Sequence, residues 1–311
     1  MTFSRNVQTA RCALELTDLI RAAGYDLSAV QTTPGPFEGR FSIVQNDDAL
    51  IVGIECNRGV RFIGRRNMRT TCFSTCITGR GWWKTQPAEF PHLVGYHNAE
   101  ASSNFMLEPT ADAPVVRLGA VLLNRQEVKQ RAQADFPRAS DLLSCSNHCT
   151  PDLFRHTQFA AEVNHRFNGG DPQADLLEMA LGMLETAERT MLISPASDAE
   201  LRLIDTLAAI TRRIQTGAKV TRATMEAELQ IGSTHLNTLM QQTVGMTPGR
   251  WITKIKTETV LQLLLDPIKR RSAGLGDQIS DAAAYVHWKE RAARTNVEKL
   301  TGALPNQVLV R

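Results

Sequence analysis

Two segments near the C-terminus of this 311-residue sequence share a layout, and this internal repeat restricts the fold more than any other feature. The first segment ends with GMTP at 245–248, and the second ends with GALP at 302–305, 57 residues later. A helical pattern of about a dozen residues precedes each glycine, and a turn and a shorter helical pattern precede that. The repeat predicts two helix-turn-helix units, at about 221–245 and 278–302.

The residues at the ends of these helices fit the predicted boundaries. Gly232 and Ser233 are acceptable caps at the start of the longer helix in the first unit. Gly245 and Gly302 follow the two longer helices, where a left-handed glycine costs little because it has no Cβ atom. The proline of each tetrapeptide then suits the first turn of a following helix.

The longer helix of each unit has an expected buried face and an expected outward face. The buried residues are Leu236, Leu239 and Met240 in the first unit and Ala293, Val297 and Leu300 in the second. The second helix of such a unit can enter the major groove of DNA, so the outward residues are candidate DNA contacts. They are Ser233, Thr234, Asn237 and Thr238 in the first unit and Lys289, Glu290, Arg291, Arg294 and Thr295 in the second.

Some of these side chains can read bases directly. Arginine can bind guanine O6 and N7 bidentately, which makes Arg291 and Arg294 candidates, with a solvated face or phosphate contacts as the alternative. Asn237 could pair with adenine, although the small polar residues around it predict less direct readout by the first unit. The run Lys269-Arg270-Arg271 between the units is either a phosphate contact or a solvated loop.

The charge distribution agrees with a polyanion-binding C-terminal region. From Glu200 onward there are 16 lysines and arginines against 10 aspartates and glutamates, an excess of six positive charges. Residues 1–199 hold 19 basic and 22 acidic residues, an excess of three negative charges. Such an asymmetry suits a nucleic-acid-binding module joined to a second domain, although solvated helical domains also carry it.

The segment that follows the first turn carries a recognisable pattern. It reads HLNTLMQQTVGMTPGRWITKIKTETVLQLL, with a Gly-x-Thr-Pro, an aromatic residue at Trp251 and a long linking helix expected at about 248–265. Over 225–265 this pattern resembles the AraC/XylS family of transcription regulators. The second unit matches the family in its spacing and in its glycine and proline.

The second unit also departs from the family pattern. His287-Trp288 stands where the family usually has Gly-Phe, and Val297 replaces the usual phenylalanine. A basic and glycine-rich stretch from Asp266 to Asp277 lengthens the linker, and Thr238 in the first unit stands where the family often has arginine. The departures in the second unit and the linker concern how that unit docks more than they concern the family resemblance, and Thr238 concerns base readout by the first unit.

The expected secondary structure changes along the N-terminal part of the chain. A helix is expected at 9–23, and short β-rich runs punctuated by Asn, Asp, Gly and Pro predict an all-β sandwich or barrel at about 40–123. After Asn124 the pattern is helical. An apolar stripe at 176–192 indicates either packing on its own domain or a dimer interface.

The family resemblance implies an α+β fold with an N-terminal cupin-like β-barrel plus helices and a C-terminal all-α domain with two helix-turn-helix units joined by a linking helix. The expected domains are a regulatory one at 1–195, with its barrel at about 40–123 and a helical dimerisation segment at about 124–192, and a DNA-binding one at 196–311. The function so implied is a sequence-specific, signal-responsive transcription regulator. Its expected partners are double-stranded DNA, a second copy of the chain, RNA polymerase and a small-molecule effector.

Several other classes receive less support. No Gly-rich phosphate loop, nucleophile elbow or His-Glu-x-x-His motif is present, so an enzyme is not expected, and neither is a cofactor. No apolar run reaches the roughly 18 residues of a membrane span, and the first ten residues lack an apolar signal core, which favours a cytoplasmic protein without a membrane partner. Two alternatives stay open: a cupin-type metal-dependent enzyme, and a regulator that acts by protein contact after its DNA binding has decayed.

Three sets of side chains could form sites but have simpler explanations. The pair Trp82-Trp83 could line an effector pocket, but core packing is favoured because neighbours on a strand face opposite ways. His92 and His97 alone do not make a cupin metal site. The pairs Cys72/Cys76 and Cys145/Cys149 are wider than usual zinc spacings, which favours ordinary buried thiols.

Overall fold

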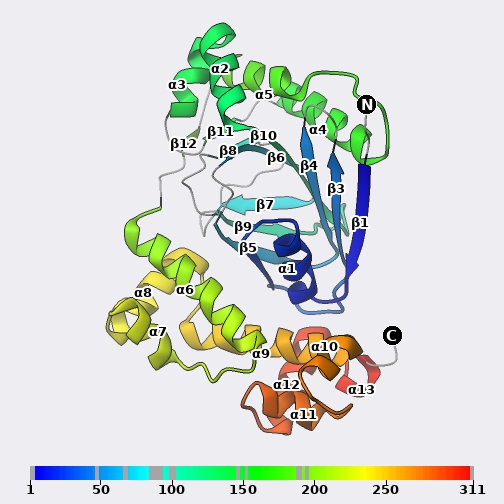
Figure 1. Cartoon of the computed structure of the whole chain (residues 1–311), viewed down its shortest axis with the longest axis vertical. Coiled ribbons are helices and arrows are strands. Elements are labelled where there is room, and N and C mark those ends of the chain that lie inside the picture. The colour runs from blue at the N-terminus through cyan, green and yellow to red at the C-terminus, as the bar shows by residue number, and fades with distance from the viewer. Residues whose placement is uncertain are drawn as a thin grey trace.

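The computed structural model shows a sheet-rich half and an all-helical half (Figure 1). The structure describes residues 4–45, 49–65, 69–83, 94–97, 103–144, 148–150, 153–186, 191–192 and 196–308. The strands are β1 (Ser4–Ala10), β2 (Leu27–Gln31), β3 (Gly39–Gln45), β4 (Leu50–Cys56), β5 (Val60–Gly64), β6 (Thr70–Thr78), β7 (Arg80–Trp83), β8 (Val94–His97), β9 (Ser103–Glu108), β10 (Val116–Asn124), β11 (His148–Thr150) and β12 (Met191–Leu192).

These strands form two antiparallel sheets. The larger sheet has the order β1-β3-β4-β10-β6-β8-β11-β12, and the smaller sheet has the order β2-β5-β9-β7. Within the described residues neither sheet closes on itself, so β1 and β12 are edges of the larger sheet. The α+β class is thus confirmed, whereas the closed cupin-like barrel predicted at about 40–123 is not found.

The strands also extend beyond the predicted β region on both sides. β1 and β2 precede residue 40, and the helix predicted at 9–23 begins only after β1 ends. The residues 5–9 of β1 are all exposed on an edge strand, so the sequence there shows no alternation of apolar and polar residues. β11 and β12 lie in the stretch predicted as helical, and with three and two residues they are too short to show any periodicity.

The helices of the sheet-rich half are α1 (Ala13–Ala22), α2 (Arg125–Asp135), α3 (Pro137–Ser144), α4 (Leu153–Phe167) and α5 (Leu176–Thr186). α2 to α5 gather at the end of the sheets away from the helical half (Figure 1). The apolar residues of α5, among them Leu176, Leu181 and Leu184, are buried in a core that this chain forms by itself. The stripe at 176–192 therefore packs on its own domain where the structure describes it, and gives a dimer interface no separate support.

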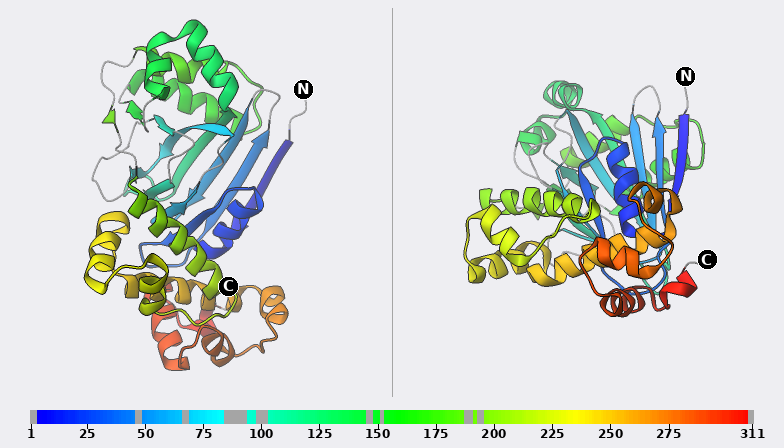
Figure 2. Two further views of the ribbon diagram at one scale, coloured as in Figure 1. Left: turned by 60° about the vertical axis from the view of Figure 1, so that its left-hand side comes forward. Right: turned by 60° about the horizontal axis from the view of Figure 1, so that its bottom comes forward.

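The all-helical half consists of α6 (Asp198–Gln215), α7 (Arg222–Leu229), α8 (Ser233–Val244), α9 (Pro248–Leu265), α10 (Pro267–Ser272), α11 (Ile279–Tyr285), α12 (Glu290–Thr301) and α13 (Pro305–Val308). Gly245 and Gly302 end α8 and α12 with left-handed backbones, at φ 69° and 72°. Pro248 and Pro305 open α9 and α13, as the repeat predicted. In both views of Figure 2 the yellow-to-red helices lie together at one end of the sheets.

The long helix α9 joins the two halves through a single core. Trp251 is fully buried, and the apolar residues around α9 include Leu14, Val30 and Ile63 from the sheet-rich half. Such an arrangement leaves α9 with little solvent-exposed surface along its length. The linking helix is therefore a shared structural element of the molecule as well as a connection between two helix pairs.

The basic stretch after α9 differs from its prediction. It forms α10, whose first turn is capped by the side chain of Asp266, instead of an open loop. The Arg270 side chain is 9% exposed and binds the Leu264 carbonyl and Asp277, while Lys269 pairs with Asp18 on α1. Both alternatives, a phosphate contact or a solvated loop, are wrong for Arg270, because its guanidinium is used inside the fold.

Within the described residues, no helix has the length and apolar character that crossing a bilayer requires.

Candidate nucleic-acid interface

The first helix pair consists of α7, a three-residue turn and α8. Thr221 and Thr224 form a capping box at the start of α7, and Met225 and Leu229 bury its inner face. Gln230 takes a left-handed backbone at φ 55° and turns the chain, after which Gly232 is the N-cap of α8. The buried residues predicted for α8, namely Leu236, Leu239 and Met240, are buried as expected.

The outward face of α8 carries four predicted contact residues. Ser233, Thr234 and Thr238 are exposed, and Asn237 is half-buried. The Thr238 hydroxyl donates back to the Thr234 carbonyl at 3.1 Å, and the Ser233 hydroxyl accepts from Arg222. Within the part of the chain that is described, the side chains of Thr234 and Asn237 have no hydrogen-bond partner, so they remain available to a ligand.

Arg222 is a cation at this face that the sequence did not single out. Its Nε atom donates to Glu226 at 2.8 Å, and its Nη2 atom donates to the Ser233 carbonyl at 2.8 Å. These bonds hold a planar guanidinium at the N-terminus of α8, beside the predicted contacts. The spacing to Glu226 fits an ordinary helical ion pair, whereas the contact with Ser233 depends on how the turn folds.

The second helix pair consists of α11, a turn at 286–289 and α12. His287 has a left-handed backbone at φ 58°, in the position where glycine is usual, and its ring nitrogen lies 2.9 Å from the Gly217 carbonyl. The next residue, Trp288, packs beneath Lys256 of α9, with the ammonium 5.8 Å from the ring centroid. The unusual His-Trp pair therefore keeps the turn and docks it on α9 and on the segment that follows α6.

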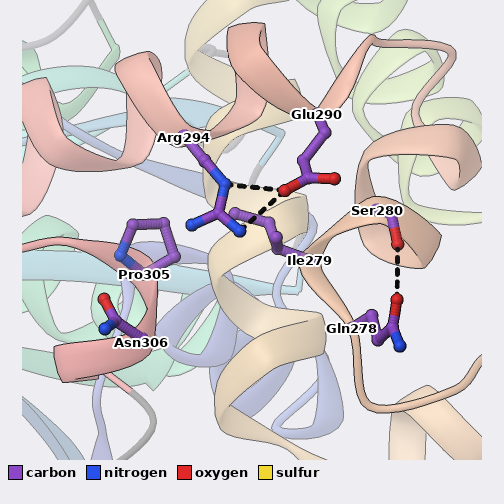
Figure 3. Close-up of a pocket in the computed structure, with 7 residues that line it drawn as sticks. All are labelled: Gln278, Ile279, Ser280, Glu290, Arg294, Pro305 and Asn306. Carbon is purple, nitrogen blue, oxygen red and sulfur yellow. Dashed lines mark hydrogen bonds and ion pairs between the residues drawn. The ribbon is translucent and has the colours of Figure 1, made fainter.

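The outward face of α12 is more strongly charged than that of α8. Lys289, Glu290, Arg291, Arg294 and Thr295 are all exposed, as predicted. Arg294 donates from Nε to the Glu290 carboxylate at 2.7 Å (Figure 3). In the described structure Lys289 and Arg291 have no ion-pair partner. Arg291 is thus free to turn toward a base, whereas Arg294 is already neutralised.

A shallow hollow lies beside the Arg294–Glu290 pair. It has a volume of about 220 Å³ and is bordered by Gln278 before α11, Arg294 on α12 and Asn306 on α13 (Figure 3). Its polar groups come from the second helix pair and from α13, which directly follows it. Arg294 and Asn306 both line the hollow, so a backbone phosphate that enters it could reach the arginine.

The positive charge of the helical half is only partly available at the surface. Arg212, Arg213, Arg222, Lys269 and Arg270 each pair with a carboxylate of the same chain. Six exposed cations have no ion-pair or hydrogen-bond partner among the described residues: Arg202, Lys219, Arg250, Lys289, Arg291 and Lys299. The excess of six charges counted from the sequence therefore overstates the freedom of individual side chains.

A buried carboxylate, Glu258, lies where α9 meets the sheet-rich half. It is 1% exposed and accepts hydrogen bonds from the backbone N–H groups of Ala13, at 3.1 Å, and Gln31, at 3.3 Å. The side chain of the N-cap residue Cys12 makes no capping hydrogen bond, and Glu258 instead caps helix α1 from 245 residues away. Burial raises the pKa of Glu258 to about 7, against the hydrogen bonds and the Lys254 charge that lower it.

Glu258 is absent from the predicted site residues, although the sequence carries a signal for it. The residue lies on the same helical face as Trp251, Ile255 and Gln262, and an acidic residue on an apolar face indicates an internal partner. What that partner is could not be predicted, because the amides that it caps lie at the opposite end of the chain.

The cysteines, histidines and tryptophans named as alternative sites have different outcomes. Cys12, Cys56 and Cys76 are buried free thiols, whereas Cys72 is half-buried, and burial raises the pKa of Cys76 to about 12. Cys145, His92 and the side chains of Cys149, His97, Trp82 and Trp83 lie outside the described residues. Within the described part of the chain, no three His, Cys, Asp or Glu side chains gather into a group that could hold a metal ion.

Comparison with known proteins returns likenesses in structure alone. No protein-family model matches the chain, and no curated protein matches it. Among solved structures, the AraC-like transcriptional activator CuxR matches at 11% identity with a TM-score of 0.42, covering 76% of this chain and 89% of its own. ToxT from Vibrio cholerae O395 matches at 11% identity with a TM-score of 0.36, covering 99% of this chain and 97% of its own. The ToxT structure bound to (E)-4-(8-methylnaphthalen-1-yl)but-3-enoic acid matches at 12% identity with a TM-score of 0.37, covering 100% and 99%.

Proposed function

We propose that this chain is a sequence-specific DNA-binding transcription regulator of the AraC/XylS type, and that α7–α8 and α11–α12 are its two helix-turn-helix units. The observation that carries the proposal is the repeat in three dimensions. Two helix pairs, each ended by a left-handed glycine and followed by a proline-initiated helix, are joined by α9 and expose polar or basic faces on their second helices. This is the arrangement in which two helices can enter successive segments of a major groove.

Each predicted contact residue has a place in this proposal. Asn237 and Thr234 on α8 and Arg291 on α12 carry the base readout, because their polar groups have no partner among the described residues. Ser233, Thr238, Glu290, Arg294 and Thr295 shape the two faces, and Lys289 at the start of α12 contacts phosphate. The regulatory domain at 1–195, the homodimer, RNA polymerase and a small-molecule effector belong to the proposal through the family resemblance. The same holds for a cytoplasmic location.

The test of this proposal is a titration of the full chain with DNA at two salt concentrations. The full chain is required because the core around α9 includes residues from the sheet-rich half, which a C-terminal fragment would lack. If about four cations contact phosphates, affinity for a duplex should fall about a hundredfold between 50 and 200 mM salt. Absence of binding even at low salt would contradict the proposal and favour the alternative of a regulator that acts by protein contact.

The two arginines of α12 are expected to differ in their effect on specificity. Arg291→Ala should cost about 1–3 kcal/mol on a duplex enriched from a random pool and much less on a scrambled duplex, because a base contact is lost. Arg294→Ala should weaken binding to both duplexes alike, because Glu290 is then left unpaired and repels phosphates. Affinities measured by fluorescence anisotropy compare the two variants.

A matched control exists in the sheet-rich half. Arg131 on α2 is exposed and pairs with Asp135 four residues on, as Arg294 pairs with Glu290 four residues before it. Arg131→Ala should leave both affinities unchanged. The quantity to compare is the ratio of the affinities for the enriched and the scrambled duplex. If this ratio falls equally in all three variants, α12 does not read bases.

A further inference from the structure

The sheet-rich half holds α8 and α12 at their C-terminal ends. Asn104 on β9 donates from Nδ2 to the carbonyl of Thr243, and the N–H of Gly35 donates to the carbonyl of Leu300 at 2.7 Å. Thr243 and Leu300 are 57 residues apart, the interval of the internal repeat. The sheet-rich half therefore contacts both candidate recognition helices at the same structural position, two residues before the left-handed glycine.

These carbonyls belong to the last turn of each helix, where the helix itself supplies no donor. A donor from another domain at that point satisfies the carbonyl and also fixes where the helix end lies. One such contact could be incidental. Two contacts at equivalent positions of a repeat restrict how far α8 and α12 can move relative to each other.

Asn104 is oriented for this contact by a buried arginine. Asn104 is 3% exposed, and its Oδ1 atom accepts a hydrogen bond from Nη1 of Arg61 at 2.8 Å. Burial lowers the pKa of Arg61 to about 10, so the guanidinium is still protonated at neutral pH and can only donate. The carbonyl of the Asn104 amide must therefore face Arg61, which leaves the NH₂ group to face Thr243. Because β5 and β9 are paired strands, the backbones that carry Arg61 and Asn104 are held side by side.

The second contact comes from a short turn that is also tied to α9. Gln31 donates from Nε2 to the carbonyls of Thr33 and Gly35, at 2.8 and 2.9 Å, and so holds the turn closed. The backbone of Gln31 bonds to Glu258 and accepts from Lys254, both on α9. The turn thus connects α9 with the end of α12.

We infer that Asn104, oriented by Arg61, and the turn that presents Gly35 are positioning residues that set the separation and angle of α8 and α12. They would thereby determine which spacing between two half-sites the protein accepts on DNA. This inference rests on the proposed function. A change of one base pair moves a half-site by about 3.4 Å and rotates it by about a tenth of a turn, so a rigid pair of helices tolerates few spacings.

The test compares the spacings that the full-length protein and its variants select from a random 40-base-pair duplex pool. Asn104→Asp keeps the acceptor for Arg61 and removes the donor to Thr243. Asn164→Asp is the matched control, because Asn164 likewise accepts from an arginine, Arg117, at 3.0 Å, and its side chain contacts no helix of the helical half in the described structure. Asn104→Ser, whose side chain is too short to bridge Arg61 and Thr243, is a second variant that is used if the aspartate variant does not fold.

The wild type and Asn164→Asp should enrich paired motifs at one spacing, with about a tenfold preference over spacings that differ by one base pair. Asn104→Asp should reduce that preference to within about threefold, with the motifs themselves unchanged. If Asn104→Asp selects paired motifs at the single spacing that the wild type selects, the positioning role is overturned and the proposed function is not. Enrichment of single, unpaired motifs by the wild type would also overturn the positioning role. If the wild type enriches no sequence, the proposed function itself is wrong.

Discussion

The stability of this protein is expected to fall as the pH rises from about 5 to about 8, and Glu258→Gln should remove much of that slope. Burial raises the pKa of Glu258 from 4.5 to about 7. Between these two values the folded protein keeps a proton that the unfolded chain has released, so a rise in pH favours unfolding. This stabilisation of the folded state is fully present below pH 4.5 and is lost as the pH rises through about 7. The difference between the two pKa values corresponds to about 3 kcal/mol in the free energy of unfolding.

Urea unfolding at pH 5, 6.5 and 8 measures this effect as the difference between wild type and variant. Glutamine cannot ionise, so the free energy of unfolding of Glu258→Gln should approach or exceed that of the wild type at the higher pH. The control is Glu298→Gln on the exposed face of α12, which should keep the wild-type slope. Parallel pH profiles for the wild type and Glu258→Gln would show that the buried carboxylate does not take up a proton in this range.

Trp251→Ala is expected to cost about 3–5 kcal/mol of stability, the largest loss of any single substitution considered. Trp251 is fully buried in the core that α9 shares with both helix pairs and with α1. Removing its ring leaves a cavity that these elements cannot fill without moving, because each is also held by its own contacts. Chemical denaturation followed by circular dichroism measures the loss.

Two other substitutions should each cost less stability than Trp251→Ala and serve as comparisons for it. Trp251→Phe should cost much less than Trp251→Ala, since it keeps most of the volume and removes an indole N–H that has no partner among the described residues. Trp288→Ala removes a tryptophan that is only half-buried and should also cost less. The packing argument fails if Trp251→Ala stays within about 1 kcal/mol of the wild type.

The helical half could be predicted from the sequence in detail because its signals are local. The left-handed glycines, the prolines at helix starts and the apolar spacing of α8 and α12 all act within one or two helical turns. The same local chemistry placed α9 at 248–265, which the structure confirms. Burial and exposure followed from periodicity alone, so the candidate contact residues are exposed as expected, apart from the half-buried Asn237.

The strands were predicted less well, because their arrangement is not a local property of the chain. The run of β-rich segments indicated a sandwich or barrel, but the way in which strands pair depends on residues far apart in the chain. Nothing in 40–123 shows that β2 joins the smaller sheet or that β1 forms an edge of the larger one. The sheet order was therefore undetermined until the tertiary structure supplied it.

The sequence by itself determined where the helices of the repeat begin and end and which of their faces are buried, because neighbouring residues carry that information. Only the tertiary structure decided what holds those helices in place. Glu258 caps Ala13 across 245 residues, Asn104 meets Thr243 across 139, and Arg270 turns inward where a basic loop was expected. The physical reason is that a buried polar group must find a partner, and which partner lies within reach depends on the folding of the whole chain.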